Sequence, residues 1–154
     1  MTFDFHLETP EQTAKLAARI APHLAPGDVL LLSGQIGAGK THFARNIIQA
    51  RQIPLGLQED IPSPTFTLVQ TYPLLDQEIW HADLYRLCNG DEILELGLID
   101  AFTQAICLIE WPDRLQDLVP KRHLALEFKQ GPTDDSRELQ ITLAGKNWEW
   151  MKSV

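Results

Sequence analysis

A glycine-rich segment that directly follows a run of apolar residues restricts the fold of this chain more than any other feature. The run at 28–32 reads Asp-Val-Leu-Leu-Leu, and the segment at 34–41 reads Gly-Gln-Ile-Gly-Ala-Gly-Lys-Thr. An apolar run without alternation is typical of a strand that is buried on both faces of a parallel sheet. The pattern Gly-x4-Gly-Lys-Thr between such a strand and a helix is that of a phosphate-binding P-loop. We therefore expect a P-loop, followed by a helix at 40–50.

The residue types in the P-loop pattern suit the binding of a nucleoside triphosphate and a magnesium ion. The glycines let the backbone turn so that its N–H groups point at the phosphates, and the helix that follows adds the positive end of its dipole. Lys40 is expected to reach the β- and γ-phosphates, and the Thr41 hydroxyl to bind Mg²⁺. The expected ligand is ATP with Mg²⁺. The predicted nucleotide-binding residues of this segment are Gly34, Gln35, Ile36, Gly37, Ala38, Gly39, Lys40 and Thr41.

The rest of the chain predicts a single α/β domain over 1–154, with the P-loop NTPase fold, a mixed, mainly parallel central sheet and helices on both faces. Strands are expected at 3–7, 28–32, 65–72, 79–87 and 105–109, and an antiparallel hairpin of 123–128 and 138–143 at the sheet edge. A first helix is expected to start at Thr9, with Pro10 in the first helical position and Gln12 completing a capping box. A short helix at 91–96 is expected to end at Gly97.

Composition and charge narrow the class of protein. Hydrophobic residues make up 44% and charged residues 22%, which is typical of a globular protein. The net charge of −8 and the scattered basic residues predict that this chain does not hold nucleic acid by its own surface, and that any RNA is held by a partner. The sequence shows no apolar run of membrane-spanning length and no signal peptide, so we expect no membrane contact and a cytoplasmic protein. Cys88 and Cys107 are too few for a disulfide framework or a zinc site, and Cys107 is expected to be buried.

Two acidic residues follow strand-like segments and are expected beside the P-loop. Glu110 ends the apolar run at 105–109, where an acid of a P-loop protein lies at the carboxyl edge of a parallel strand. Asp83 lies on a predicted strand on which His81, Asp83 and Tyr85 share one face. One acid is expected to hold Mg²⁺ and the other to orient the attacking water. The spacing leaves open which of the two has which role.

Two further features have both a functional and a structural interpretation. Ser63, Thr65 and Thr67 form either a switch segment that meets the γ-phosphate and Mg²⁺, or ordinary strand hydroxyls. Arg86 either neutralises phosphate charge or forms a structural salt bridge.

Other polar and aromatic residues have the same ambiguity. Trp111 either stacks near the nucleotide or a partner, or anchors the fold as a partly buried aromatic. His42 and His81 have no other His or Cys at metal-ligand spacing, so we interpret neither as a metal ligand.

Five sequence blocks occur together in one order. They are the P-loop at 34–41, Ser-Pro-Thr-Phe-Thr-Leu-Val at 63–69, His-Ala-Asp-Leu-Tyr-Arg-Leu at 81–87, Glu-Leu-Gly-Leu at 95–98 and Ile-Glu-Trp-Pro at 109–112. The P-loop alone is unspecific, but the other blocks in this order are highly specific. The chain resembles the TsaE (YjeE) family throughout, from the first helix to the last hairpin.

The resemblance implies a small bacterial ATPase that is needed to make threonylcarbamoyladenosine in tRNA. Such a protein binds the TsaD–TsaB complex, and its ATP hydrolysis resets that complex between turnovers without transferring the threonylcarbamoyl group. The resemblance also implies site residues, which are Lys40 and Thr41 at phosphate and Mg²⁺, Asp83 and Glu110 as acids, Thr65 in the switch block and Trp111 at the edge of the site. The chain departs from the family pattern at Gln35, where Asp is usual, and at His42, where Thr or Ser is usual.

Three alternative functions remain for a chain with this P-loop. A small-molecule kinase needs an arginine-rich lid and room for an acceptor, and the sequence shows neither. A GTPase switch needs a guanine-reading Asn-Lys-x-Asp motif, which is absent. A nucleotide-binding scaffold without turnover is disfavoured by the intact Lys40, Thr41 and two acids.

Overall fold

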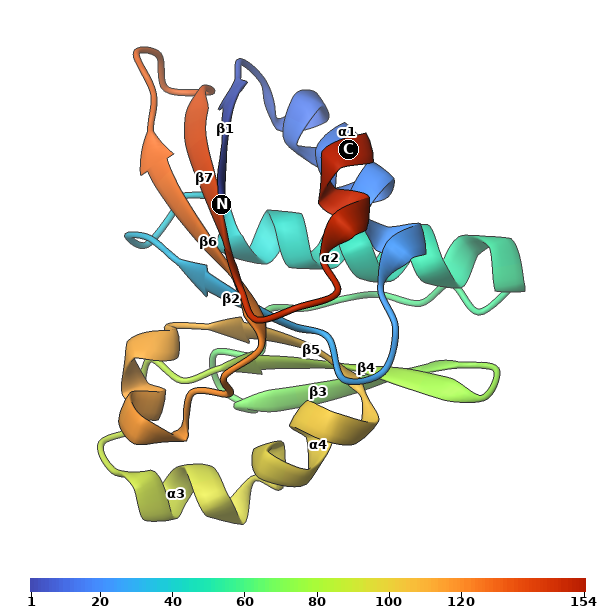
Figure 1. Cartoon of the computed structure of the whole chain (residues 1–154), viewed down its shortest axis with the longest axis vertical. Coiled ribbons are helices and arrows are strands. Elements are labelled where there is room, and N and C mark those ends of the chain that lie inside the picture. The colour runs from blue at the N-terminus through green and yellow to red at the C-terminus, as the bar shows by residue number, and fades with distance from the viewer.

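The computed structural model describes residues 1–154 and contains one seven-stranded sheet (Figure 1). The strands are β1 (Thr2–Leu7), β2 (Val29–Ser33), β3 (Val69–Leu74), β4 (Gln77–Asp83), β5 (Ile106–Glu110), β6 (His123–Gln130) and β7 (Arg137–Ala144). Their order across the sheet is β1-β7-β6-β2-β5-β4-β3. The four central strands β6, β2, β5 and β4 are parallel neighbours, and the three outer pairings are antiparallel. The predicted mixed sheet is confirmed, with its parallel part confined to the centre.

Helices cover both faces of the sheet, as predicted. They are α1 (Pro10–Ile20), α2 (Lys40–Gln52), α3 (Gly90–Glu95) and α4 (Leu98–Gln104), with 3-10 turns η1 (Ala21–His23), η2 (Ile53–Leu55), η3 (Pro112–Leu118) and η4 (Glu149–Ser153). Figure 1 shows α1 and α2 on one face, and α3 and α4 on the other.

The apolar run of β2 supplies both cores. Leu30 and Leu32 belong to the core under α1 and α2, whereas Val29 and Leu31 belong to the core under α3 and α4. Side chains of a strand alternate between its two faces, so a strand covered on both sides needs apolar residues at every position. This explains why the run shows no alternation.

The first helix begins where the sequence predicts. The Thr9 hydroxyl accepts a hydrogen bond from the Gln12 N–H at 3.2 Å, and Pro10 takes the first helical position. The Gln12 side chain accepts from the Glu8 N–H at 2.8 Å, one residue before the position that a capping box uses. Gly97, with φ +81°, separates α3 from α4, and α4 itself was not predicted.

The predicted strand at 65–72 is wrong in its first half. Residues 64–68 form a turn, in which the Leu68 N–H donates to the Pro64 carbonyl at 2.7 Å. Leu68 has φ +69°, a backbone conformation that a strand does not allow, and β3 begins only at the next residue. The Leu68 carbonyl then accepts from the Asp83 N–H at 2.9 Å, so the turn is held against the end of β4.

The predicted strand at 79–87 is also too long, because β4 ends at Asp83. The Leu84 N–H donates to the Glu110 carbonyl at 3.1 Å, and the Tyr85 N–H donates to the Asp83 carboxylate at 3.0 Å. These bonds turn the chain after Asp83. Tyr85 therefore does not continue the face that His81 and Asp83 share.

The hairpin of β6 and β7 is present, but it does not lie at the edge of the sheet. β6 pairs with β2 on one side, and β1 pairs with β7 along its whole length, from Thr2 to Leu7. The edges are β1 and β3. A strand at the edge of a sheet has backbone N–H and C=O groups that are free to pair with another strand. In this fold β1 pairs with the free groups of β7, so the hairpin lies inside the sheet.

No helix in the structure combines the length and the apolar character that crossing a membrane requires.

Candidate functional site

The glycines of the P-loop are required by its backbone geometry. Gly34 has φ +144°, and a Cβ atom at this position would lie 2.6 Å from the Phe128 carbonyl oxygen of β6, so no larger residue fits. Gly39, with φ +110°, is the N-cap of α2 and has no side chain to cap the helix. The first N–H groups of α2 therefore have no side-chain acceptor, which is the arrangement of an anion-binding helix terminus.

Lys40 is buried in the P-loop, with a side chain that already contacts carbonyl groups. Its Nζ donates to the Gly34 carbonyl and, at 3.0 Å, to the Gln35 carbonyl, and it lies 4.2 Å from the centroid of the Trp111 ring. Burial lowers the pKa of Lys40 below its ordinary value, and Glu110 and Asp83 partly oppose this shift. A buried ammonium group with neutral partners is well suited to an anionic ligand such as phosphate.

Glu110 lies at the carboxyl end of β5, next to the first turn of α2. The Thr41 hydroxyl donates to both of its carboxylate oxygens, at 2.8 and 3.0 Å. The Nε2 atom of His81 lies 2.6 Å from its Oε2 atom. The contact with Thr41 depends on the parallel pairing of β2 with β5, which sets Leu32 opposite Glu110.

Asp83 lies at the end of β4, opposite Glu110 in the parallel ladder. Its Oδ2 atom accepts a hydrogen bond from the Thr65 hydroxyl at 3.0 Å, and Thr65 in turn lies 2.8 Å from the Ser63 hydroxyl. The segment from Ser63 to Thr65 is therefore attached to an acid of the site. Thr67 is exposed and takes no part in this chain of bonds.

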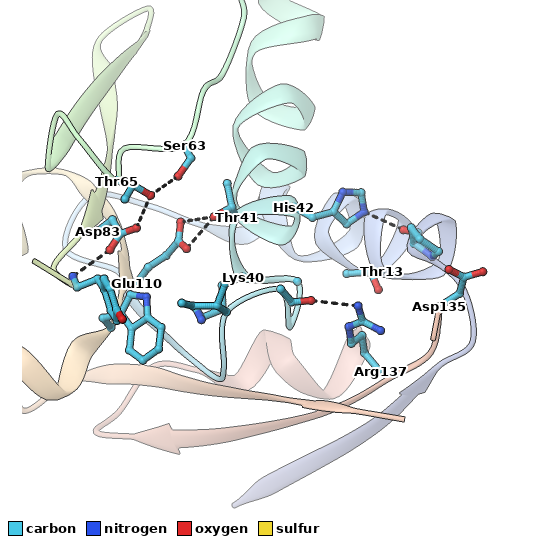
Figure 2. Close-up of a pocket in the computed structure, with 16 residues that line it drawn as sticks. Thr13, Lys40, Thr41, His42, Ser63, Thr65, Asp83, Glu110, Asp135 and Arg137 are labelled. Carbon is cyan, nitrogen blue, oxygen red and sulfur yellow. Dashed lines mark hydrogen bonds between the residues drawn. The ribbon is translucent and has the colours of Figure 1, made fainter. Parts of the chain in front are cut away.

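A cavity of about 560 Å³ opens over these residues. Its volume falls in the usual range for small-molecule sites. Figure 2 shows Thr65, Asp83 and Glu110 on one side of Lys40, and His42 and Arg137 on the other. Of the predicted site residues, the cavity wall includes Ile36, Gly37, Gly39, Lys40, Thr41, Thr65, Asp83, Glu110 and Trp111. Gly34, Gln35 and Ala38 lie outside this wall, and two of them supply the carbonyls that hold Lys40.

Arg137 is a residue of the cavity that sequence reasoning missed. It lies at the start of β7, where its Nε donates to the Ala38 carbonyl at 3.0 Å and its Nη2 to the Gly37 carbonyl at 3.1 Å. Its Nη1 donates to the carbonyls of Asp134 and Ser136, at 2.6 and 2.8 Å. Arg137 therefore ties the P-loop to the β6–β7 turn. A single arginine at the start of a strand gives no signal of such a role.

His42 and Arg86 have structural contacts that the sequence did not indicate. The Nε2 atom of His42 lies 3.0 Å from the Pro10 carbonyl, and His42 lines the cavity where α1 meets α2. Arg86 donates to the carbonyls of Thr65 and Phe66, at 3.4 and 3.3 Å, and lies outside the cavity wall. Arg86 therefore supports the turn at 64–68 and does not form the salt bridge considered above.

Trp111 follows Glu110 and is half-buried at the mouth of the cavity. Its backbone is in the left-handed region, with φ +58°. Its ring lies beside the Lys40 ammonium group, and the ring centroid is 4.8 Å from that of Tyr85. Trp111 is therefore a partly buried aromatic that packs against Tyr85, and it also forms part of the cavity wall.

The donor set suits magnesium rather than a transition metal. No three or more His, Cys, Asp or Glu side chains surround a common metal position. Mg²⁺ needs only one or two carboxylates, because water and phosphate oxygens complete its shell. The Thr41 hydroxyl and the Glu110 carboxylate, with Asp83 on the neighbouring strand, offer oxygen atoms of this kind.

Comparisons with known proteins give consistent results. Residues 7–139 match the family model described as threonylcarbamoyl adenosine biosynthesis protein TsaE. The tRNA threonylcarbamoyladenosine biosynthesis protein TsaE of Bacillus subtilis is 36% identical over 143 residues, which cover 92% of this chain and 86% of that protein. The protein of the same description from Rickettsia bellii is 40% identical over 136 residues, which cover 88% and 92%. The crystal structure of Bacillus subtilis YdiB has a TM-score of 0.78 and 27% identity, covering 99% of this chain and 93% of that one.

Proposed function

This chain belongs to the TsaE family of tRNA threonylcarbamoyladenosine biosynthesis, and from that premise we propose that it binds ATP with Mg²⁺ and hydrolyses the ATP. The hydrolysis supports the TsaD–TsaB complex in the cytoplasm, where that complex forms the modified nucleoside. The observation that carries the proposal is the contact of the Thr41 hydroxyl with both oxygens of Glu110, beside the buried Lys40. The groups proposed to bind phosphate and the cation therefore line the same cavity.

Each residue of the site has a defined task in this proposal. The Lys40 ammonium and the first N–H groups of α2 bind the phosphates. Thr41 and one of the two acids, Asp83 or Glu110, hold the cation, and the other acid orients the attacking water. Bound Mg²⁺ neutralises charge that develops on the phosphates. Thr65, bonded to Asp83 at 3.0 Å, links the loop before β3 to the reacting end of the nucleotide.

Hydrolysis by the isolated chain should be slow because the one arginine that lines the cavity is already bonded to carbonyl groups. The guanidinium of Arg137 donates to four carbonyl groups, and Arg86 lies outside the cavity. In related chemistry an arginine supplied in trans adds about three to five orders of magnitude in rate. The TsaD–TsaB complex is the proposed source of the missing group, and tRNA is met only through that complex because this chain carries a net charge of −8.

A titration tests the proposal. The TsaD–TsaB complex is titrated with this chain loaded with either ADP or a non-hydrolysable ATP analogue, and phosphate release from ATP is measured alongside. Tighter binding in one nucleotide state, with faster phosphate release in the presence of the complex, is the expected result, because a switch requires different affinities for its two states. Equal affinities together with unstimulated release would leave a passive nucleotide-binding scaffold as the better description.

A further inference from the structure

His81 is buried next to Glu110, and its two ring nitrogens have different surroundings. Nε2 lies 2.6 Å from the Oε2 atom of Glu110, whereas Nδ1 is buried without any hydrogen-bond partner. The exposed fraction is 0% for His81 and 2% for Glu110. His81 does not line the cavity, whereas Glu110 does. Any effect of His81 on a bound ligand must therefore pass through Glu110.

The surroundings of the two nitrogens determine where the ring proton lies. The contact with Glu110 is satisfied when Nε2 carries the proton and donates it to Oε2, which leaves Nδ1 with a lone pair. In the other tautomer Nδ1 would carry a buried N–H without an acceptor, and Nε2 would have no proton to donate to the carboxylate. Orphaned buried N–H groups are rare in folded proteins, and an unpaired acceptor is tolerated more often.

We propose that His81 is the positioning residue of Glu110, because its Nε2–H fixes the carboxylate against the Thr41 hydroxyl. The effect of His81 on cation binding rests on the proposed function, whereas its contact with Glu110 does not. His81 pairs with Leu108 in the ladder of β4 and β5, and Asp83 pairs with Glu110 two residues further along. His81 therefore approaches Glu110 from the buried part of the ladder and bonds to Oε2, whereas Oε1 contacts only the Thr41 hydroxyl.

Loss of the imidazole removes the only side-chain donor to Glu110 besides Thr41. The carboxylate then loses its fixed orientation and has one buried oxygen with less hydrogen bonding. Groups that orient a metal-binding carboxylate in this way typically contribute about 10–100-fold to metal affinity or activity. A purely structural histidine would lower stability without changing the Mg²⁺ dependence of nucleotide binding.

The first test is the proton position in the nucleotide-free chain. The chain has five histidines, and ¹⁵N labelling of histidine with assignment of the His81 ring resolves its tautomer at neutral pH. The expected result is a proton on Nε2. A ring whose Nε2 carries no proton overturns the proposal. This measurement needs no nucleotide, so it is independent of whether the chain hydrolyses ATP.

The second test uses variants and measures the factor by which Mg²⁺ changes ADP affinity. His81→Leu should reduce that factor about tenfold or more, and His81→Gln should restore part of it, because the glutamine amide also donates. In a Glu110→Gln background the effect of His81→Leu should largely disappear, since coupled residues are not additive. His6→Leu is the matched control, because His6 lies 2.5 Å from Glu138 in an exposed pair on β1 and β7. Full additivity with Glu110→Gln, or equal effects of Leu and Gln at His81, overturns the proposal.

Discussion

The hydroxyl of Thr41 donates to both carboxylate oxygens of Glu110, at 2.8 and 3.0 Å, although 69 residues separate the two in the chain. Thr41 belongs to the first turn of α2 and Glu110 to the last position of β5. The parallel ladder of β2 and β5 brings them together, because the strand that leads into the P-loop ends beside the strand that ends in the acid. The predictions below test what this contact and its neighbours do.

Lys40→Ala should weaken the binding of ATP with Mg²⁺ by at least about tenfold. The ammonium is buried, and a charge-assisted contact to phosphate in such a site is worth roughly 2–4 kcal/mol. Calorimetry measures the affinity, and circular dichroism checks that the variant is folded. Lys121→Ala, at an exposed lysine, is the control and should bind as the parent does. An unchanged affinity in a folded Lys40→Ala protein would contradict the assignment of the P-loop.

Asp83→Asn and Glu110→Gln should reduce ATP hydrolysis far more than nucleotide binding. Cation and water positioning stabilise mainly the transition state, whereas the P-loop N–H groups and Lys40 bind the phosphates in both states. Phosphate release is measured with the TsaD–TsaB complex present, and affinity is measured separately for ADP. If both variants release phosphate at the parent rate, the roles given to the two acids are wrong.

Arg137→Ala should weaken nucleotide binding about tenfold, although Arg137 is far from the motif in the sequence. Its guanidinium donates hydrogen bonds to the Gly37 and Ala38 carbonyls. Loss of these hydrogen bonds detaches the P-loop from the β6–β7 turn. Hydrogen bonds to a charged donor contribute about 1.5–3 kcal/mol. Arg137→Lys should recover little, because one ammonium cannot donate to carbonyls on both sides as the planar guanidinium does.

The matched control for Arg137 is Arg19→Ala, an exposed arginine on α1 for which the structure shows no side-chain hydrogen bond. Affinity is measured by calorimetry for all three variants. Binding that is equally strong in Arg137→Ala and Arg19→Ala would show that Arg137 does not organise the P-loop.

The thiol of Cys107 should make the protein less stable at high pH. Burial in the core, with a smaller contribution from Glu78, raises the pKa of Cys107 from 9.0 to about 12. Between these values the folded thiol keeps its proton and the unfolded one loses it, so the unfolded state binds fewer protons and stability falls as the pH rises. The contribution is fully present well below pH 9.0 and is reduced by about 3 kcal/mol near pH 11.

Denaturant unfolding at pH 8 and pH 11 measures this loss. Cys107→Ala should lower stability at pH 8, because it leaves a small cavity, and should show a smaller drop in stability between pH 8 and pH 11. A thiol reagent at pH 8 should modify only Cys88 in the folded protein, since Cys88 is exposed and Cys107 is buried. Equal pH dependence of the parent and the variant would contradict the raised pKa.

Local patterns in the sequence identified the elements of the site. The glycines of 34–41 and the apolar run before them predicted a strand, a turn and a helix, because a motif of adjacent residues fixes its own backbone conformation. The order of the sequence blocks also indicated the family, which the comparisons confirm. Glu110 and Asp83 were expected at strand ends, and the structure has them at the ends of β5 and β4.

The tertiary structure alone decided which distant side chains meet. The bonds of Thr41 and His81 to Glu110, and of Arg137 to the P-loop, depend on which strands pair and in which register. The left-handed Leu68 ended a strand-like pattern early because its carbonyl accepts from the end of β4. Periodicity in a sequence reports which face of an element is apolar, and it carries no information about the partner across that face. Packing between segments far apart in the chain therefore determined the site's geometry, whereas the sequence determined its chemistry.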